Sequence, residues 1–180
     1  MKKFVWTFGL IAGGIMAAMM TLTIVFEKQF GWGQNEVFGY TTMLLAFLMV
    51  YFGIRSYRDN VMAGSIGFGR AFKVGVLITV VASTCYVAAW EVSYHTVATD
   101  FVEKYAARSV EKARTSGATD AEVAATKAEM DKFAVQYKNP AINIAYTYIE
   151  VLPLGIVVTL VSAGVLSRKR NDPTPMMAGG

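Results

Sequence analysis

The chain has 180 residues, of which 54% are hydrophobic, 13% aromatic and 17% charged. Soluble domains carry about a quarter charged residues and seldom gather apolar residues in long blocks, so this composition excludes an ordinary soluble domain. The formal net charge is +4, but the basic residues flank apolar blocks and form no continuous basic face with interleaved aromatics. We therefore expect no nucleic-acid partner and a single membrane domain over residues 1–170.

The first apolar run, 4–26, follows two lysines and contains no charged residue. About 20 apolar residues rising about 1.5 Å each cross the hydrocarbon layer, so we expect a membrane helix. A cleaved signal peptide is the competing interpretation; the run exceeds a signal core and lacks a clear small-x-small cleavage site, which favours retention. Gly9 and Gly13 form a small-xxx-small pair that lets another helix approach closely, or are ordinary glycines of an apolar helix.

Two further apolar runs, 37–54 and 71–94, are separated by a glycine-rich loop with basic residues at both ends. We expect both runs to be membrane helices and the loop to be an interfacial elbow, because its glycines fit neither dinucleotide nor nucleotide-loop spacing. Cationic groups beside a bilayer favour anionic lipid headgroups. The residues expected to contact headgroups are Arg55, Arg58, Arg70 and Lys73.

The segment 95–139 is polar, with seven acidic and seven basic residues. No Gly or Pro interrupts the chain between Tyr94 and Gly117, so we expect the third helix to continue past the membrane and to turn near Gly117. A second helix is expected to begin at Thr119, where Glu122 three residues later completes a capping box. The segment is therefore predicted to be an extracytoplasmic helical hairpin.

A fourth apolar run, 141–166, is preceded by a helix start in which Asn139 is the cap and Pro140 the first helical residue. It ends at the basic residues 168–170. The last ten residues, 171–180, include two prolines and two terminal glycines and are expected to be disordered. The sequence thus predicts an all-α integral membrane protein with four transmembrane helices.

Four spans place both termini on one side of the membrane, and the basic residues indicate which side. Segments predicted to face inward carry nine Lys and Arg against two Asp, whereas the long outer hairpin is neutral. The positive-inside rule therefore places both termini in the cytoplasm. The nine basic residues are Lys2, Lys3, Arg55, Arg58, Arg70, Lys73, Arg168, Lys169 and Arg170.

Glu150 lies inside the fourth run, three residues before Pro153. A proline within a helix leaves the carbonyl four residues earlier without its donor, so a carboxylate and a freed carbonyl are expected side by side. Counting about 1.5 Å per residue from Leu166 and from Val74 places Glu150 and Glu91 at similar depth, near the outer edge of the hydrocarbon.

Two more residues complete a candidate ion or proton site at this outer edge. Glu36 is expected at a like height, and His95, the single histidine, lies one turn beyond Glu91. Carboxylates in hydrocarbon pair, protonate or face water, which suits proton or cation handling; the alternative is that these groups reach the headgroup layer and are hydrated. Metal binding by Glu91, His95 and Glu150 stays open, because Glu-xxx-His is not a specific ligand motif.

Enzyme and cofactor motifs are missing from the sequence. It has no Ser-His-Asp order, no nucleotide loop and no paired catalytic carboxylates, so no cofactor is expected. The single cysteine, Cys85, excludes an intramolecular disulfide and is expected to pack as a small buried hydrophobe.

Three blocks carry a resemblance to a known family: GIRSYRDN at 53–60, GSIGFGRAFKVG at 64–75 and YIEVLPLG at 148–155. The chain resembles the bacterial membrane proteins grouped as domain of unknown function 4199. The resemblance implies a compact four-helix fold in a bacterial inner membrane, and it carries over no catalytic residues because the family has no established activity.

We expect a non-enzymatic protein that acts by assembly, as a homo-oligomer or with another membrane protein, in contact with the lipid bilayer. Four helices scarcely enclose a wide pore, and the Gly9/Gly13 face is one candidate seam for self-association. The alternative is a proton or cation conduit built on Glu150, Glu91 and His95. A lipid-acting protein that uses the basic loop is a third class, which topology alone makes weaker.

Overall fold

A computed structural model describes residues 1–30 and 36–167, without the side chains of residues 27–38. The described chain is all-α, with six helices and no strand, as predicted. The tail predicted to be disordered, 171–180, lies outside the described residues. The helices are α1 (Lys2–Phe30), α2 (Glu36–Val61), α3 (Phe68–Thr96), α4 (Phe101–Thr115), α5 (Asp120–Tyr137) and α6 (Pro140–Leu166).

Within the described residues, three helices are long and apolar enough to cross a membrane: α1 over Lys2–Phe26, and α3 and α6 over their whole lengths. Helices of this length and composition indicate a membrane protein. The described part of α2 is less apolar than these three, because tyrosine and threonine lie near its start and Arg55 and Arg58 near its end.

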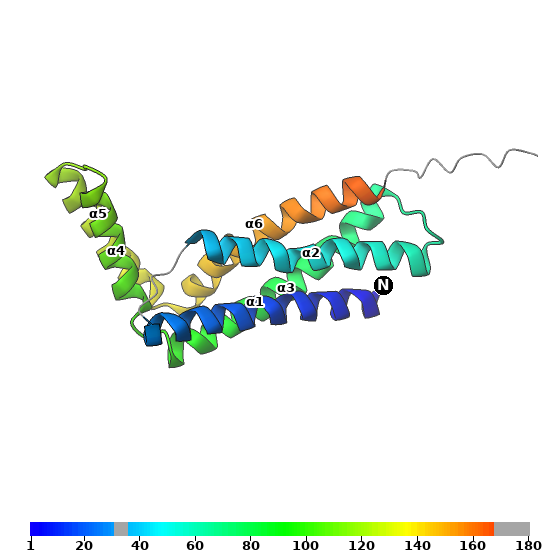
Figure 1. Cartoon of the computed structure of the whole chain (residues 1–180). Helices are drawn as coiled ribbons and strands as arrows, with labels where there is room; N and C mark the ends of the chain where they lie inside the picture. Colours follow the sequence, from blue (N-terminus) through cyan, green and yellow to red (C-terminus); the bar gives the residue numbers. More distant parts are fainter. Residues whose placement is uncertain (31–35, 168–180) are drawn as a thin grey trace, which may run out of the picture.

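Four helices, α1, α2, α3 and α6, lie side by side as a bundle (Figure 1). Helix α3 packs against α1 on one side and α6 on the other, and α2 closes the bundle against all three. The amino terminus, the α2–α3 connection and the end of α6 lie at one end, which we call the basic end. Helices α4 and α5, residues 101–137, project beyond the opposite end and are called the arm.

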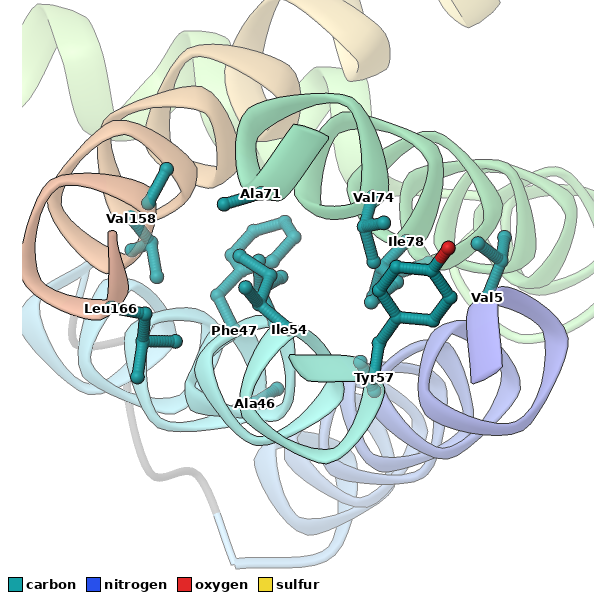
Figure 2. Packing of buried hydrophobic residues seen from close by; sticks show 14 of the residues in the cluster. Val5, Ala46, Phe47, Ile54, Tyr57, Ala71, Val74, Ile78, Val158 and Leu166 are labelled. Carbon is teal, nitrogen blue, oxygen red and sulfur yellow. The ribbon is translucent and has the colours of Figure 1, made fainter. Parts of the chain in front are cut away.

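The centre of the bundle is filled with apolar side chains. Phe47 and Ile54 of α2 meet Val74 and Ile78 of α3 between the four helices, and all four are fully buried (Figure 2). Val151 of α6 is buried in the same cluster. These buried side chains hold the helices in one register, because close-packed side chains resist sliding.

The predicted continuation of the third helix beyond Tyr94 is wrong. Helix α3 ends at Thr96, where the amides of Val97 and Ala98 both bond to the carbonyl of Ser93, and α4 begins separately at Phe101. No breaker residue marks this end. Ala98 is buried with the aromatic residues at the base of the arm, so tertiary packing turns the chain where local sequence would let the helix run on.

The helix ends predicted near Gly117, at Thr119 and at Asn139 are confirmed. Helix α4 stops at Thr115, and Gly117 has φ +82°, a conformation that glycine adopts at little cost. Thr119 and Glu122 form the predicted capping box at the start of α5. The side chain of Asn139 accepts the Ala141 amide, and Pro140 occupies the first turn of α6.

Candidate functional site

The site is built on a tight crossing of α3 and α6. A Cβ added to Gly75 would lie 2.6 Å from Thr159 and 2.9 Å from Ile54, and one added to Gly155 would collide with Thr79. The hydroxyls of Thr79 and Thr159 are 3.0 Å apart at the same crossing. Glycine therefore brings the two backbones close enough for small polar side chains to bond across the interface.

Three cross-helix contacts fix the register of α3 against α6. Thr79 lies against Gly155, the Thr84 and Tyr148 hydroxyls are 2.9 Å apart, and Trp90 donates to Asn143 at 3.0 Å. The two helices therefore run antiparallel, and each residue of α6 can be assigned a level on α3.

Glu150 lies near the middle of both apolar helices. It falls between the first two contacts, two residues from Tyr148, and is thus level with the stretch of α3 between Thr79 and Thr84. That stretch contains the midpoint of α3, and Pro153, three residues from Glu150, is the midpoint of α6. Glu150 therefore lies at mid-height of the bundle, and its predicted position near the outer edge of the hydrocarbon stays a prediction.

Glu91 does not share the depth of Glu150. It follows Trp90, which is level with Asn143, so the two acids are separated by about the seven residues from Asn143 to Glu150, or about 10 Å along the bundle. Counting from Val74 and from Leu166 misaligns the two helices, because Gly75 lies opposite Thr159 and the two starting points are therefore at different levels.

Glu91 and His95 do face each other on α3. The Glu91 Oε2 and His95 Nε2 atoms are 3.7 Å apart, and the imidazole is exposed. The other carboxylate oxygen, Oε1, is buried without a hydrogen-bond partner among the described residues. The pair lies at the end of the bundle from which the arm projects, separate from Glu150.

The predicted ion site also included a possible metal ion and Glu36. Within 1–30 and 36–167, no three His, Cys, Asp or Glu residues come together in a way that could hold a metal ion. Glu36 is the first residue of α2, and its side chain lies outside the described residues. The structure therefore joins Glu91 to His95 and leaves Glu150 apart from both.

Glu150 is exposed on the outer surface of α6, and the exposed side chains of α6 between it and the basic end are apolar. Ile149 beside it is 68% exposed, and Val157 and Val161 continue the exposed stripe. Pro153 lies within α6 and has no N–H, so the carbonyl of Ile149 lacks its helical donor. A carboxylate and a freed carbonyl thus share the surface at mid-height of the bundle.

A second polar group, absent from the sequence predictions, joins the arm to the bundle. The Trp90 Nε1–H is 3.0 Å from both the Tyr137 hydroxyl and the Asn143 side-chain oxygen, which come from α5 and α6. The Thr147 hydroxyl donates to the Asn143 carbonyl at 3.0 Å. All four side chains are buried. The one hint in the sequence is Asn143 itself, an amide inside an apolar run.

Aromatic rings surround this junction. The Trp90 and Phe101 ring centroids are 4.7 Å apart, and those of Phe133 and Tyr137 are 4.9 Å apart. Burial raises the pKa of the Tyr137 phenol to about 12; hydrogen bonds with Trp90 and Thr147 oppose this rise, and the Glu150 charge adds to it. The phenol is therefore neutral at all physiological pH values.

Helix-packing residues predicted from the sequence lie inside the bundle. A Cβ on Gly9 would lie 2.7 Å from Val81, and one on Gly13 would lie 2.5 Å from the Cβ of Cys85. The Gly9/Gly13 face is thus occupied by α3 of the same chain. The residues predicted to contact headgroups gather at the basic end, where Asp59 lies 2.7 Å from Arg58 and 3.7 Å from Arg55.

The chain is a helical membrane protein by class, because three helices of its bundle are long and apolar enough to cross a bilayer. A family model described as a protein of unknown function, DUF4199, matches residues 7–168. The chain therefore belongs to the DUF4199 family, which confirms the resemblance found in the sequence. No curated protein and no solved structure matches the chain.

Proposed function

We propose that all four bundle helices cross a bacterial inner membrane, with both termini in the cytoplasm and the arm outside. The packing of α2 supports a fourth span, because its middle residues Phe47, Val50 and Ile54 are fully buried against the other helices. Lys2 and Lys3 lie at the same end as the basic residues of α2 and α3 that flank the α2–α3 connection, and this gathering supports the orientation. The exposed basic side chains there would contact anionic headgroups.

Cysteine labelling tests this topology. In a Cys85→Ser background, Ser116→Cys at the tip of the arm is expected to react with an impermeant maleimide in intact cells, and Ser65→Cys in the α2–α3 connection only after lysis. Reporters fused to both termini are expected to report the cytoplasm. Reporters on opposite sides would contradict four spans.

Within this topology we propose that the protein is not an enzyme and acts by binding another protein or a second copy. The observation that carries this proposal is the arm. Its only buried residues are Val102 in α4 and Tyr137 in α5, both at the base. Two helices of 15 and 18 residues, supported beyond that base only by each other, present their flanks to a partner.

A photo-crosslinking residue at Val135 tests this proposal in native membranes. Val135 is 72% exposed on α5, and we expect a discrete adduct with another protein or a second copy. The same residue at Trp6, exposed near the opposite end on α1, is the matched control and is expected to give lipid adducts only. Lipid adducts alone at Val135 and at further arm positions would contradict the proposal.

A proton or cation conduit is the second candidate, favoured by the carboxylate of Glu150 at mid-height. The bundle axis is filled by side chains such as Phe47 and Ile78, so a path would have to follow the outer surface of α6. We expect the proton and cation flux through vesicles that contain the purified protein to be the same for the wild type and for Glu150→Gln. A flux that depends on Glu150 would favour the conduit over assembly.

A further inference from the structure

We propose that Glu150 and the carbonyl of Ile149 form a docking point for a lysine or arginine on a membrane helix of another protein. The inference rests on the proposed function and names the chemistry of the partner. Both groups accept hydrogen bonds and neither donates when Glu150 is charged. They lie together on the exposed side of α6, next to Pro153.

The surroundings of Glu150 make a donor necessary. The flanking exposed residues of α6, Ile149, Val157 and Val161, are apolar, as expected for a surface that meets lipid. A carboxylate at the middle of a bilayer is costly unless it pairs, and an unsatisfied carbonyl adds to that cost. No hydrogen bond or ion pair joins Glu150 to another described residue.

The basic residues at the basic end are too far away to supply this donor. Gly75 contacts both Ile54 and Thr159, so Arg55, which follows Ile54, lies near the level of Thr159. Thr159 is nine residues from Glu150, which corresponds to about 14 Å. Lys73 is about nine residues along α3 from the level of Glu150, or about 14 Å.

The remaining bundle helix is no closer. The contacts of Gly13 with Cys85 and Ala82 place residue 12 of α1 near the level of Glu150. Lys3 is then nine residues away, about 14 Å. Ion pairs on helices join groups on adjacent turns, about 6 Å apart, so none of these residues reaches the carboxylate.

A second copy in the same orientation does not solve the problem. Its basic residues lie at the same heights as those of the first copy, far from Glu150. Its Glu150 would lie at the height of the first Glu150, and the two negative charges would repel each other. Charge complementarity therefore selects a different protein with a basic residue near the middle of one span. Pairing between membrane helices through such groups is a recognised source of association.

Designed peptides test this proposal without knowledge of the natural partner. The probe is a single-span leucine–alanine peptide with one central lysine, and the matched peptide carries glutamine there. Full-length protein labelled at Ser65→Cys, in a Cys85→Ser background, is reconstituted in phosphatidylcholine vesicles, and association is followed by energy transfer. The lysine peptide is expected to bind about five- to thirtyfold more tightly than the glutamine peptide.

Three variants of the protein separate the contributions. Glu150→Gln is expected to remove the preference for lysine, and Pro153→Ala, which restores a donor for the Ile149 carbonyl, to reduce it about two- to threefold. Glu91→Gln is the control, because this acid lies about 10 Å away along the bundle, and is expected to leave the preference unchanged.

Several outcomes would overturn the proposal. Equal binding of both peptides would show that Glu150 takes no cation from a neighbouring helix. Self-association of the wild-type protein that Glu150→Gln abolishes would identify a second copy as the occupant, and flux that requires Glu150 would identify an ion. If the arm crosslinks to a partner whatever residue stands at 150, the proposed function stands and this inference falls.

Discussion

The bundle and the arm are held together by different means. The bundle helices pack closely at glycines such as Gly75 and Gly155, where side chains of neighbouring helices occupy the space that a Cβ would need. The arm is attached by rings and one indole donor at its base, and most of its length is exposed. The bundle is therefore sensitive to added atoms along its whole length, whereas the arm is sensitive mainly at the junction.

The largest effect is expected for Gly155→Leu. A Cβ at this position would collide with Thr79 and lie 2.8 Å from the Phe47 ring, so the variant should lose about 3 kcal/mol of unfolding free energy in detergent. Gly14→Leu, where nothing lies within 4 Å, is the control and should change stability by less than about 0.5 kcal/mol. Equal losses would show that the crossing is not tight.

Trp90→Phe tests the other side of the comparison. The variant keeps a ring but removes the indole donor that the Tyr137 hydroxyl and the Asn143 oxygen share, which should cost about 1–3 kcal/mol. The loss should appear as faster amide exchange throughout α4 and α5, with the bundle less affected. Trp6→Phe, on the exposed surface of α1, should leave exchange unchanged. Equally faster amide exchange in the arm and in the bundle would contradict the view that the junction stabilises mainly the arm.

A smaller effect is expected for Thr79→Val, which removes one hydroxyl from the α3–α6 crossing. Hydrogen bonds between membrane helices contribute about 0.6 kcal/mol on average, so the loss should be of that order. Thr159→Val combined with it should cost little more, because both changes remove the same bond. Thr21→Val, whose hydroxyl bonds only within α1, is the control. Additive losses would argue against a bond across the crossing.

The smallest effect concerns the far end of the arm. The Thr119 amide and hydroxyl donate to the Glu122 carboxylate at 2.8 and 2.9 Å, which holds the pKa of Glu122 below its ordinary value. A lowered folded-state pKa gives stability that is present above the unfolded pKa and is lost as the pH falls through the folded pKa. Amides in the first turn of α5 should therefore exchange faster, relative to those of Glu122→Gln, as the pH drops below about 4. If amide exchange depends on pH in the same way in the wild type and in Glu122→Gln, the Glu122 carboxylate does not stabilise the start of α5.

Much of the fold could be predicted because the apolar runs and helix caps are local signals. Thr119 and Asn139 mark helix starts through hydrogen bonds to residues only two or three positions away. The break after Thr96 had no such signal, since it depends on the burial of Ala98 against residues far along the chain.

The candidate site was predicted less well, for a related reason. The sequence identifies Glu150 and its neighbour Pro153, but depth requires the register of α6 against α3. That register is set by Gly75 and Gly155, whose contacts are with other helices and leave no local pattern. The Trp90–Tyr137–Asn143 junction joins three helices and could not be assembled from spacing alone.

Nitroxide depth measurement tests the central claim, that Glu150 lies near the middle of the membrane and Glu91 near its edge. Glu150→Cys and Glu91→Cys, each in a Cys85→Ser background, would be spin-labelled in vesicles, and oxygen and nickel-complex accessibilities compared. We predict that the label at 150 is deeper by about 10 Å. Equal depths would contradict the register of α3 and α6, and the docking point proposed on it.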